Sequence, residues 1–260
     1  MSRRAGATGR RRAGAELEVG GYARLDRDRP RRVGVPEVVL GEGKTVEHLL
    51  GILRHLHAQG SGALVSRPAP TQRRALERAR AEGLPLRTLA GGRLVRLEGP
   101  LGVRYRPGTA AIVTAGTSDV PIAEEAREVL RALGIRVVHE HDVGVAGLHR
   151  LLAAIRRLER SRPEIYLVFA GREGALPTVV AGLVRAPVVG VPTSTGYGRG
   201  GRGEAALNAM LQSCAPLAVV NIDAAVPAAL FAAQQFVVRG GRAHSRRDGH
   251  EGGRSAPRRR

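Results

Sequence analysis

The stretch GTAAIVTAGTSDVPIAEEAREVLRALGIRVV, residues 108–138, contains the pattern that decides the fold. It begins with an apolar run at 110–114, bounded by turn residues, which predicts a buried strand. Residues 121–133 place apolar side chains at helical spacing, and Gly134 is typical of a helix end. A second strand candidate, Ile135-Arg136-Val137-Val138, follows. This order predicts two parallel strands joined by a crossover helix.

The alternation of strand and helix patterns continues to residue 237. Further apolar runs predict strands at 165–169, 187–191 and 217–221. Helical patterns predict helices at 147–159, 174–183, 203–213 and 224–237. Strands that are apolar on both faces, each followed by a helix, are typical of a parallel sheet covered on both sides. We therefore expect an α/β domain with a Rossmann-like or flavodoxin-like parallel sheet over residues 108–238.

A smaller N-terminal α/β domain is expected over residues 33–99. Strand candidates lie at 37–40, 63–66, 85–89 and 93–97. Thr45 is a candidate N-cap for a first helix, and residues 71–82 form a second, polar helix. Residues 1–32 are interpreted as a basic tail with an entry segment, and residues 29–32 show no periodicity. Residues 239–260 are interpreted as a disordered basic tail.

The chain is strongly basic, with a net charge of +19 over 260 residues. Residues 1–14 contribute five of these charges, and residues 239–260 contribute six. Lys44 is the only lysine, so that 41 of the 42 basic residues are arginine. This ratio indicates codon bias more than selection for phosphate contacts. We therefore expect no nucleic-acid partner, and an Arg-rich nucleic-acid binder on this scaffold is the non-enzyme alternative.

Cys214 is the one cysteine, so no disulfide can form within the chain and a reducing, cytoplasmic location is expected. No apolar run reaches the roughly 18–20 residues that span a bilayer, so no membrane association is expected. Cys214 follows the predicted helix at 203–213. A helix C-terminus opposes a thiolate, and a lone cysteine is usually a buried apolar residue. Spacing alone therefore does not predict a catalytic role for this cysteine.

Ligands of open parallel sheets bind beyond the C-terminal ends of the strands, so the residues after each strand form the candidate site. Four such residues follow the first strand: Gly116, Thr117, Ser118 and Asp119. Hydroxyls and a carboxylate at a helix N-terminus suit a phosphate or a ribose, because free N–H groups and the helix dipole attract an anion. An ordinary helix N-cap would use the same residue types. This motif alone leaves both interpretations open.

The next three loops carry further candidates: Asp142, His149, Arg150, Glu173, Gly174, Ser194 and Tyr197. The His-Arg pair after the second strand could supply an acid or base and an anion clamp, or could simply lie on a helix surface. The carboxylate after the third strand could act as a base or bind a metal. The glycine-rich loop after the fourth strand is typical of a lid or a ligand loop, but also of a plain connection.

Taken together and in order, these loops resemble the LarB family. The motifs that carry the resemblance lie at 116–119, 142–150, 173–177, 192–198 and 208–216. Residues 36–45 resemble the N-terminal domain of the same family, and the whole resemblance covers roughly residues 22–238. The C-terminal half also resembles PurE, the aminoimidazole ribonucleotide carboxylase of purine synthesis.

Departures from the two patterns favour LarB over PurE. PurE has a histidine directly before the Leu-Pro pair that Leu176 and Pro177 match, and this histidine is missing here. PurE also lacks the N-terminal domain and has no counterpart of Cys214. Arg172 departs from the LarB pattern, where methionine is expected, and it leaves the protonation state of Glu173 open.

The LarB resemblance implies an enzyme of nickel-pincer cofactor biosynthesis. Its reaction adds CO2 to C5 of the pyridinium ring of nicotinic acid adenine dinucleotide and hydrolyses the phosphoanhydride. The products are pyridinium-3,5-biscarboxylic acid mononucleotide and AMP. The PurE resemblance implies, as an alternative, an aminoimidazole ribonucleotide carboxylase or mutase.

The same resemblance implies roles for the candidate residues. Cys214 becomes the nucleophile, and Glu173, Asp142 or His149 becomes the base. Substrate binding is expected from Gly116, Thr117, Ser118, Asp119, Arg150, Gly174, Ser194 and Tyr197. Mg²⁺ is the expected cofactor and CO2 or bicarbonate the co-substrate, while the metal ligands stay unassigned. A dimer-based homo-oligomer is expected, with an octamer as one form.

Overall fold

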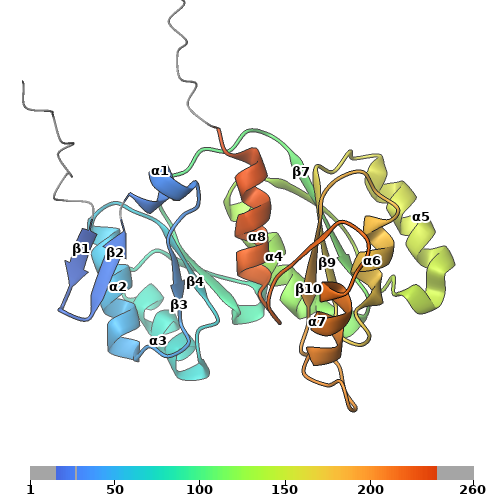
Figure 1. Cartoon of the computed structure of the whole chain (residues 1–260). Helices are drawn as coiled ribbons and strands as arrows, with labels where there is room; N and C mark the ends of the chain where they lie inside the picture. Colours follow the sequence, from blue (N-terminus) through green and yellow to red (C-terminus); the bar gives the residue numbers. More distant parts are fainter. Residues whose placement is uncertain (1–15, 27, 239–260) are drawn as a thin grey trace, which may run out of the picture.

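The computed structural model of the chain describes residues 16–26 and 28–238 (Figure 1). Its larger sheet lies in the C-terminal half, and all its strands are parallel. The strands are β7 (Thr109–Thr114), β8 (Arg136–Glu140), β9 (Ile165–Ala170), β10 (Val188–Pro192) and β11 (Leu217–Val219). Their order is β11-β10-β9-β7-β8, which is the flavodoxin-like order. The predicted parallel sheet is therefore confirmed, and its topological switch point lies between β7 and β9.

Helices cover both faces of this sheet, as the apolar strands require. One face packs against α4 (Val120–Ala132) and α8 (Ala225–Ala233). The other packs against α5 (Leu148–Glu159), α6 (Ala175–Ala181) and α7 (Glu204–Leu211). Neighbouring residues of one strand divide between the two cores: Ile112 of β7 belongs to the first core and Val113 to the second.

The N-terminal domain contains a mixed sheet in the order β3-β4-β6-β5. Its strands are β3 (Val38–Leu40), β4 (Ala63–Ser66), β5 (Leu86–Leu89) and β6 (Leu94–Leu97). One face is covered by α2 (Val46–Ala58) and α3 (Pro70–Ala81). Thr45 caps α2 as predicted, because its hydroxyl accepts a hydrogen bond of 3.2 Å from the backbone N–H of His48.

Part of the segment that the sequence assigns to a tail and lead-in is structured. Strands β1 (Glu16–Val19) and β2 (Ala23–Asp26) pair in an antiparallel hairpin, and α1 (Arg29–Val33) follows. Val19 and Leu25 are buried in the core of the N-terminal domain. Both strands alternate apolar and polar residues on either side of the turn at Gly20 and Gly21, a hairpin signal that the interpretation of this segment as a tail overlooked. The interpretation as a tail was therefore wrong for residues 16–26 and 28–32.

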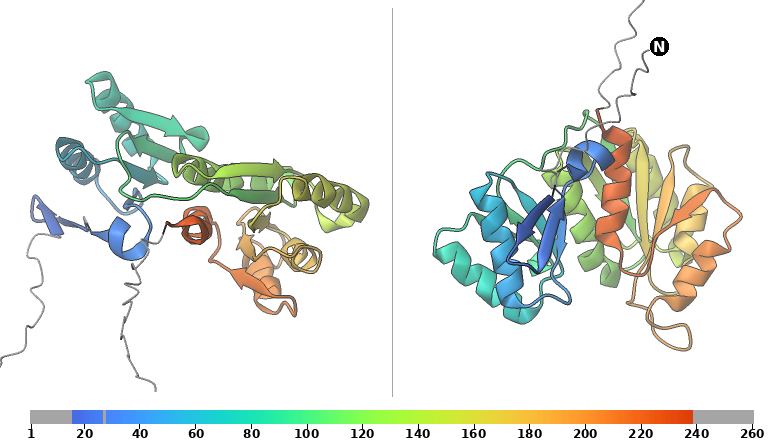
Figure 2. Two further views of the ribbon diagram at one scale, coloured as in Figure 1. Left: turned by 90° about the horizontal axis from the view of Figure 1, so that it is seen from above. Right: turned by 60° about the vertical axis from the view of Figure 1, so that its left-hand side comes forward.

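Helices α4 and α8 form a layer that both sheets share. Leu64 of β4 and Leu94 of β6 are fully buried in the same apolar cluster as the residues of α4 and α8. Figure 1 and the right-hand view of Figure 2 show α8 between the N-terminal domain and the strands of the C-terminal sheet. The two domains therefore have one continuous core.

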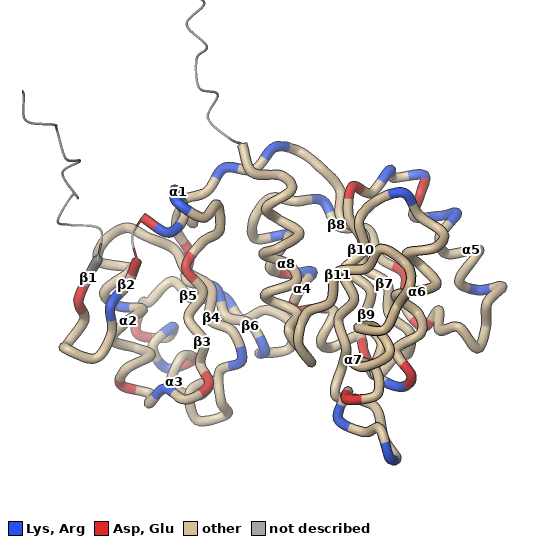
Figure 3. The backbone as a smooth tube through the Cα atoms, in the orientation of Figure 1, with Lys and Arg blue, Asp and Glu red and all other residues tan. Residues whose placement is uncertain are grey.

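Helix length and the distribution of charge relate to the two partners that are not expected, a membrane and nucleic acid. Within residues 16–26 and 28–238, no helix has the length and apolar character needed to cross a membrane. Basic and acidic residues are interspersed over both domains (Figure 3). The basic tails predicted at residues 1–14 and 239–260 lie outside the described residues.

Candidate functional site

The candidate site lies at the C-terminal edge of the parallel sheet, where the loops after β7, β8, β9 and β10 meet. The loops after β9 and β10 touch so closely that a Cβ on Gly171 would collide with the hydroxyls of Thr193 and Thr195. Gly174 has φ +68°, and a Cβ there would lie 2.5 Å from the carbonyl oxygen of Ala206 at the start of α7. Only glycine fits this position, because it combines a left-handed backbone with no room for a side chain.

Asp119 holds the first and fourth of these loops together. Its side chain is only 2% exposed. One carboxylate oxygen accepts hydrogen bonds from the hydroxyls of Thr193 at 2.6 Å and Thr195 at 2.9 Å. The other accepts the backbone N–H of Gly116 at 2.8 Å. A buried carboxylate with three donors is a structural anchor for the rim of the site.

The remaining residues of the first loop face outward. Thr117 and Ser118 are exposed and start a short 3₁₀ helix, Thr117–Asp119, that leads into α4. Their hydroxyls are therefore accessible to a ligand at the N-terminus of α4. Gly116 is half-buried, and its N–H already donates to Asp119.

Asp142 and Arg150 come together after β8. The Arg150 guanidinium donates to the Asp142 carboxylate at 3.1 Å and to the Asp142 carbonyl at 2.8 Å. Asp142 has φ 55°, an uncommon conformation that aspartate tolerates better than most residues. Its backbone N–H donates to the Thr114 hydroxyl at 3.2 Å. His149 lies exposed in the first turn of α5, next to this pair in sequence.

His141 was not singled out from the sequence, although it directly precedes Asp142. Its ring nitrogen Nδ1 lies 3.4 Å from the Thr114 hydroxyl. Its ring centroid lies 4.7 Å from that of His139. Partial burial, with the neighbouring His139 as a second cause, lowers the pKa of His141. His141 is therefore neutral over a wider pH range than a free histidine.

Exposed side chains of the third and fourth loops form a second pair. The Arg172 guanidinium lies 4.2 Å from the centroid of the Tyr197 ring and donates a hydrogen bond to the Tyr197 hydroxyl. Tyr197 is 73% exposed, so much of its ring stays accessible. Glu173 is also exposed, and among the described residues it makes no ion pair within 4.0 Å. Glu173 and Tyr197 therefore lie on adjacent parts of the rim.

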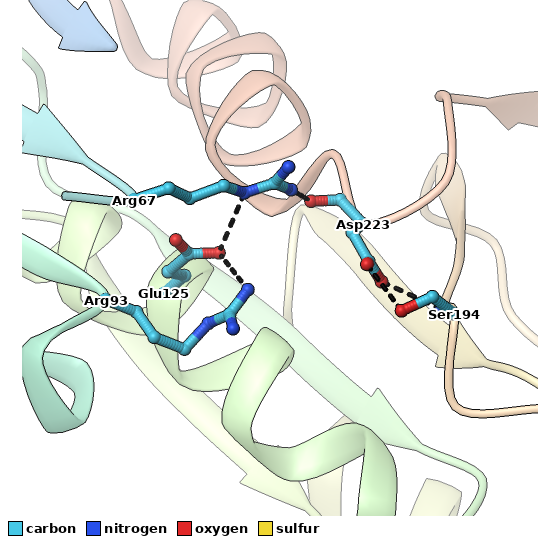
Figure 4. Close-up of polar contacts among 5 residues, drawn as sticks. All are labelled: Arg67, Arg93, Glu125, Ser194 and Asp223. Carbon is cyan, nitrogen blue, oxygen red and sulfur yellow. Dashed lines mark hydrogen bonds and ion pairs between the residues drawn. The ribbon is translucent and has the colours of Figure 1, made fainter. Parts of the chain in front are cut away.

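Ser194 is held by a residue that follows the fifth strand. Asp223 accepts the backbone N–H of Ser194 at 2.9 Å and its hydroxyl at 2.6 Å (Figure 4). Asp223 comes four residues after the end of β11, and Asp142 comes two residues after the end of β8. The strand-end rule would have found it if it had also been applied to the last strand.

Cys214 lies apart from the other candidates. It is exposed and lies between α7 and β11, at the edge where the parallel strands begin. Ala206, which contacts Gly174, precedes it by eight residues. At 1.5 Å per helical residue, the part of α7 from Ala206 to Leu211 leads the chain about 7.5 Å away from the rim before Cys214 is reached. One chain therefore does not bring Cys214 together with Glu173, Asp142 or His149.

A metal site cannot be assigned from the protein side chains alone. Within the part of the chain that the structure describes, no group of three or more His, Cys, Asp or Glu side chains could hold a metal ion. Mg²⁺ usually keeps several waters and takes one or two carboxylates together with substrate phosphates. The exposed carboxylates of Asp142 and Glu173 fit that kind of binding.

Two family descriptions match the chain. Residues 109–246 match the family described as AIR carboxylase. Residues 17–90 match the LarB/PurE-like N-terminal domain. The second match includes the hairpin of β1 and β2, which the structure packs into the same domain.

Similar proteins come from several organisms. An uncharacterized protein of Methanocaldococcus jannaschii is 36% identical over 83% of this chain and 84% of its own length. An N5-carboxyaminoimidazole ribonucleotide mutase of the same organism is 32% identical over 46% of this chain and 74% of its own length. A crystal structure of Treponema denticola PurE has a TM-score of 0.39 and 25% sequence identity, and the similarity covers 47% of this chain and 78% of that one.

Proposed function

Because the chain belongs to the AIR carboxylase family and carries the LarB/PurE-like N-terminal domain, we propose that it carboxylates nicotinic acid adenine dinucleotide. CO2 is added at C5 of the pyridinium ring, and the phosphoanhydride is hydrolysed. The products are pyridinium-3,5-biscarboxylic acid mononucleotide and AMP. This reaction belongs to nickel-pincer cofactor biosynthesis.

The observation that carries this proposal is the pair of domains in one chain. The uncharacterized M. jannaschii protein matches 83% of the chain, across both domains, whereas the ribonucleotide mutase of the same organism matches only 46%. The N-terminal domain shares a core with the C-terminal domain through Leu64 and Leu94. It is therefore an integral part of the protein and favours the LarB reaction over that of the shorter relatives.

The chemistry needs a nucleophile because a pyridinium ring is electron-poor and does not attack CO2. A thiolate that adds to C4 or C6 converts the ring into a dihydropyridine. Addition at C4 makes C5 the β-carbon of an enamine, and addition at C6 makes it the terminal carbon of a dienamine. In either case C5 forms a bond to the carbon of CO2. Loss of the C5 proton to a base and expulsion of the thiolate restore the aromatic ring. Cys214 suits this role, because a thiolate both adds and leaves readily.

Among the three candidate bases, Glu173 is the best placed. Asp142 already shares its carboxylate with Arg150 at 3.1 Å. His149 lies on the exposed start of α5. Glu173 has no ion pair among the described residues and follows β9 directly at the switch point of the sheet. Its carboxylate is free to accept a proton from the substrate.

The rim residues supply the binding groups. The exposed hydroxyls of Thr117 and Ser118 at the N-terminus of α4 suit a phosphate or a ribose. The accessible ring of Tyr197 suits stacking on a heterocycle. Mg²⁺ would bind mainly through the substrate phosphates, with the exposed carboxylate of Asp142 as a ligand from the protein, and it would polarise the phosphoanhydride when bound.

The position of Cys214 connects the reaction with the oligomeric state. The thiol lies where the parallel strands begin, whereas Glu173 follows the C-terminal end of β9, so the proposed reaction requires the thiol to come from a second copy of the chain. We therefore expect a dimer-based homo-oligomer, with an octamer as one form. Light scattering of the purified protein should give a multiple of the chain mass. A strict monomer that still turns over would contradict the shared site.

The reaction is tested by mass spectrometry. Purified protein is incubated with nicotinic acid adenine dinucleotide, ¹³C-bicarbonate and Mg²⁺. A labelled dicarboxylated mononucleotide that forms in equal amount with AMP is the expected result. Folded protein that gives neither product would reject the proposed substrate.

The second candidate function is that of an aminoimidazole ribonucleotide carboxylase or of an N5-carboxyaminoimidazole ribonucleotide mutase. It is favoured by the relatives named as N5-carboxyaminoimidazole ribonucleotide mutases. The histidine expected before Leu176 is replaced by Ala175, which speaks against it. The same protein preparation should leave N5-carboxyaminoimidazole ribonucleotide unchanged, and rapid conversion of that compound would reverse the order of the two candidates.

A further inference from the structure

A buried carboxylate connects the two domains close to the candidate site. Glu125 of α4 has a side chain that is 0% exposed. It faces two arginines of the N-terminal domain: Arg93 Nη2 lies 3.4 Å from Glu125 Oε2, and Arg67 Nε lies 4.0 Å from it. Burial raises the pKa of Glu125, and the two guanidinium groups oppose this shift. A buried carboxylate requires such partners, because an unpaired charge in a core is strongly destabilising.

Arg67 makes a second contact that Arg93 does not make. Its Nη2 donates a hydrogen bond to the backbone carbonyl of Asp223, while its Nε faces Glu125 (Figure 4). Arg67 follows β4 in the N-terminal domain, and Asp223 follows β11 in the C-terminal domain. One guanidinium therefore joins α4 to the loop after β11, which its planar fork of donors allows.

Asp223 also contacts the candidate site, through Ser194. Its carboxylate accepts the N–H of Ser194 at 2.9 Å and the hydroxyl at 2.6 Å. Its own N–H donates to the carbonyl of Pro192 at 2.8 Å. Both Arg67, with φ 50°, and Asp223, with φ 56°, have left-handed backbones. Non-glycine residues keep this conformation only where the surrounding contacts determine it.

We propose that Arg67 is a positioning residue by which the N-terminal domain fixes the substrate loop, defined as residues 193–203. The chain of contacts runs from Glu125 through Arg67 to Asp223 and ends at Ser194. This inference rests on the proposed function only in taking Ser194 as a residue of the substrate site. It gives the N-terminal domain a positioning role at the candidate site, through the contact of Arg67 with Asp223.

Arg93 provides a matched control within the same cluster. It pairs with the same oxygen of Glu125, at a similar exposure: 36% against 33% for Arg67. Substituting either arginine with glutamine removes one partner of Glu125. Only Arg67→Gln also removes the contact with Asp223. A difference between the two variants therefore reports on the connection to the substrate loop and not on the loss of a salt bridge.

The first test measures hydrogen–deuterium exchange of the full-length protein by mass spectrometry, without substrate. Arg67→Gln should raise the exchange rate of peptides from the substrate loop by about tenfold, the effect of one lost hydrogen bond to a charged group. Arg93→Gln should stay within about twofold of the wild type. Equal exchange in the two variants would overturn the proposal. If Arg67→Gln does not fold, Arg67→Lys serves instead, because one ammonium cannot serve both partners as the guanidinium fork does.

The second test separates binding from chemistry. Arg67→Gln should raise KM for nicotinic acid adenine dinucleotide by about fivefold or more with a smaller effect on kcat, while Arg93→Gln leaves KM near the wild-type value. Faster loop exchange with an unchanged KM would also overturn the positioning role. If the wild type shows no turnover, the proposed function fails, and the exchange experiment still decides whether Arg67 holds the loop.

Discussion

Asp119 illustrates how one residue can satisfy both a sequence motif and a structural need. The motif places it among phosphate-binding residues, but the structure buries it and gives all three of its hydrogen bonds to the protein. Its neighbours Thr117 and Ser118 stay exposed at the same helix N-terminus. Ligand contact by Asp119 itself stays a prediction, whereas its anchoring of Thr193 and Thr195 follows from the contacts.

Replacing Asp119 by asparagine should destabilise the protein by about 2 kcal/mol. The amide nitrogen of asparagine cannot accept from the Gly116 N–H or from a threonine hydroxyl, so at least one buried donor loses its partner. Urea unfolding monitored by circular dichroism measures the change. Thr195→Val, which removes one of the three donors, should cost about 1 kcal/mol. An Asp119→Asn variant as stable as the wild type would contradict the anchor.

Cys214 is the residue whose role depends most on the proposed chemistry. Cys214→Ser should keep substrate affinity within about threefold but reduce carboxylation by at least about a thousandfold, because a hydroxyl is a far weaker nucleophile than a thiolate. Isothermal titration and the labelled-bicarbonate assay measure the two effects. Ser213→Ala changes the neighbouring residue and should remain active. A fully active serine variant would reject the covalent scheme.

At the scale of elements, β8 and α5 are joined by a bidentate ion pair between Glu140 and Arg157. Arg157 Nε lies 2.7 Å from one oxygen of Glu140, and Nη2 lies 2.8 Å from the other. This hydrogen bonding lowers the pKa of Glu140 below its usual value of 4.5. A carboxylate whose pKa is lowered by folding stabilises the folded state above that value. The stabilisation is lost as the pH falls through the lowered pKa.

The difference in unfolding free energy between wild type and Glu140→Gln should therefore shrink as the pH falls from 7 to 3. The effect at pH 7 should be small, less than about a fivefold change in the unfolding constant, because the guanidinium of Arg157 is half exposed and solvent screens the pair. Urea unfolding at several pH values measures it. Arg157→Gln should show the same pH dependence, and a pH-independent difference would contradict this assignment.

The molecule as a whole is held together by the helix layer of α4 and α8. Because both sheets pack on this layer, neither domain has a separate core on that side. The two domains should therefore unfold together. The same layer brings Glu125 to Arg67 and Arg93, and thereby connects the N-terminal domain to the site.

Leu94→Ala should lower the stability of the whole protein by about 3 kcal/mol, because it opens a cavity in the shared core. Calorimetry and urea unfolding should still show one cooperative transition. Leu53→Ala, in the core that belongs to the N-terminal domain alone, should shift the same transition. Two separate transitions in either variant would mean that the domains fold independently.

The periodic patterns of the sequence determined the elements and the type of sheet. The five parallel strands and their helices were predicted within a few residues, because continuous apolar runs and helical spacing are local properties. The strand-end rule also led to Asp142, Glu173 and Ser194, since parallel strands place their C-terminal ends at one edge. The hairpin of β1 and β2 was missed although its strands alternate apolar and polar residues around Gly20 and Gly21, because the charged segment before it was interpreted as a tail.

Only the tertiary structure decided which distant residues meet. No local pattern indicates that Arg67 reaches Asp223, that Asp119 turns inward to Thr193 and Thr195, or that α4 and α8 serve two sheets. These contacts join residues far apart in the chain, and their partners are selected by packing and by the need to pair buried charges. The sequence by itself thus determined the parallel sheet and the edge that carries the candidate site. Folding decided how the N-terminal domain is connected to that edge, because long-range packing alone brings the two together.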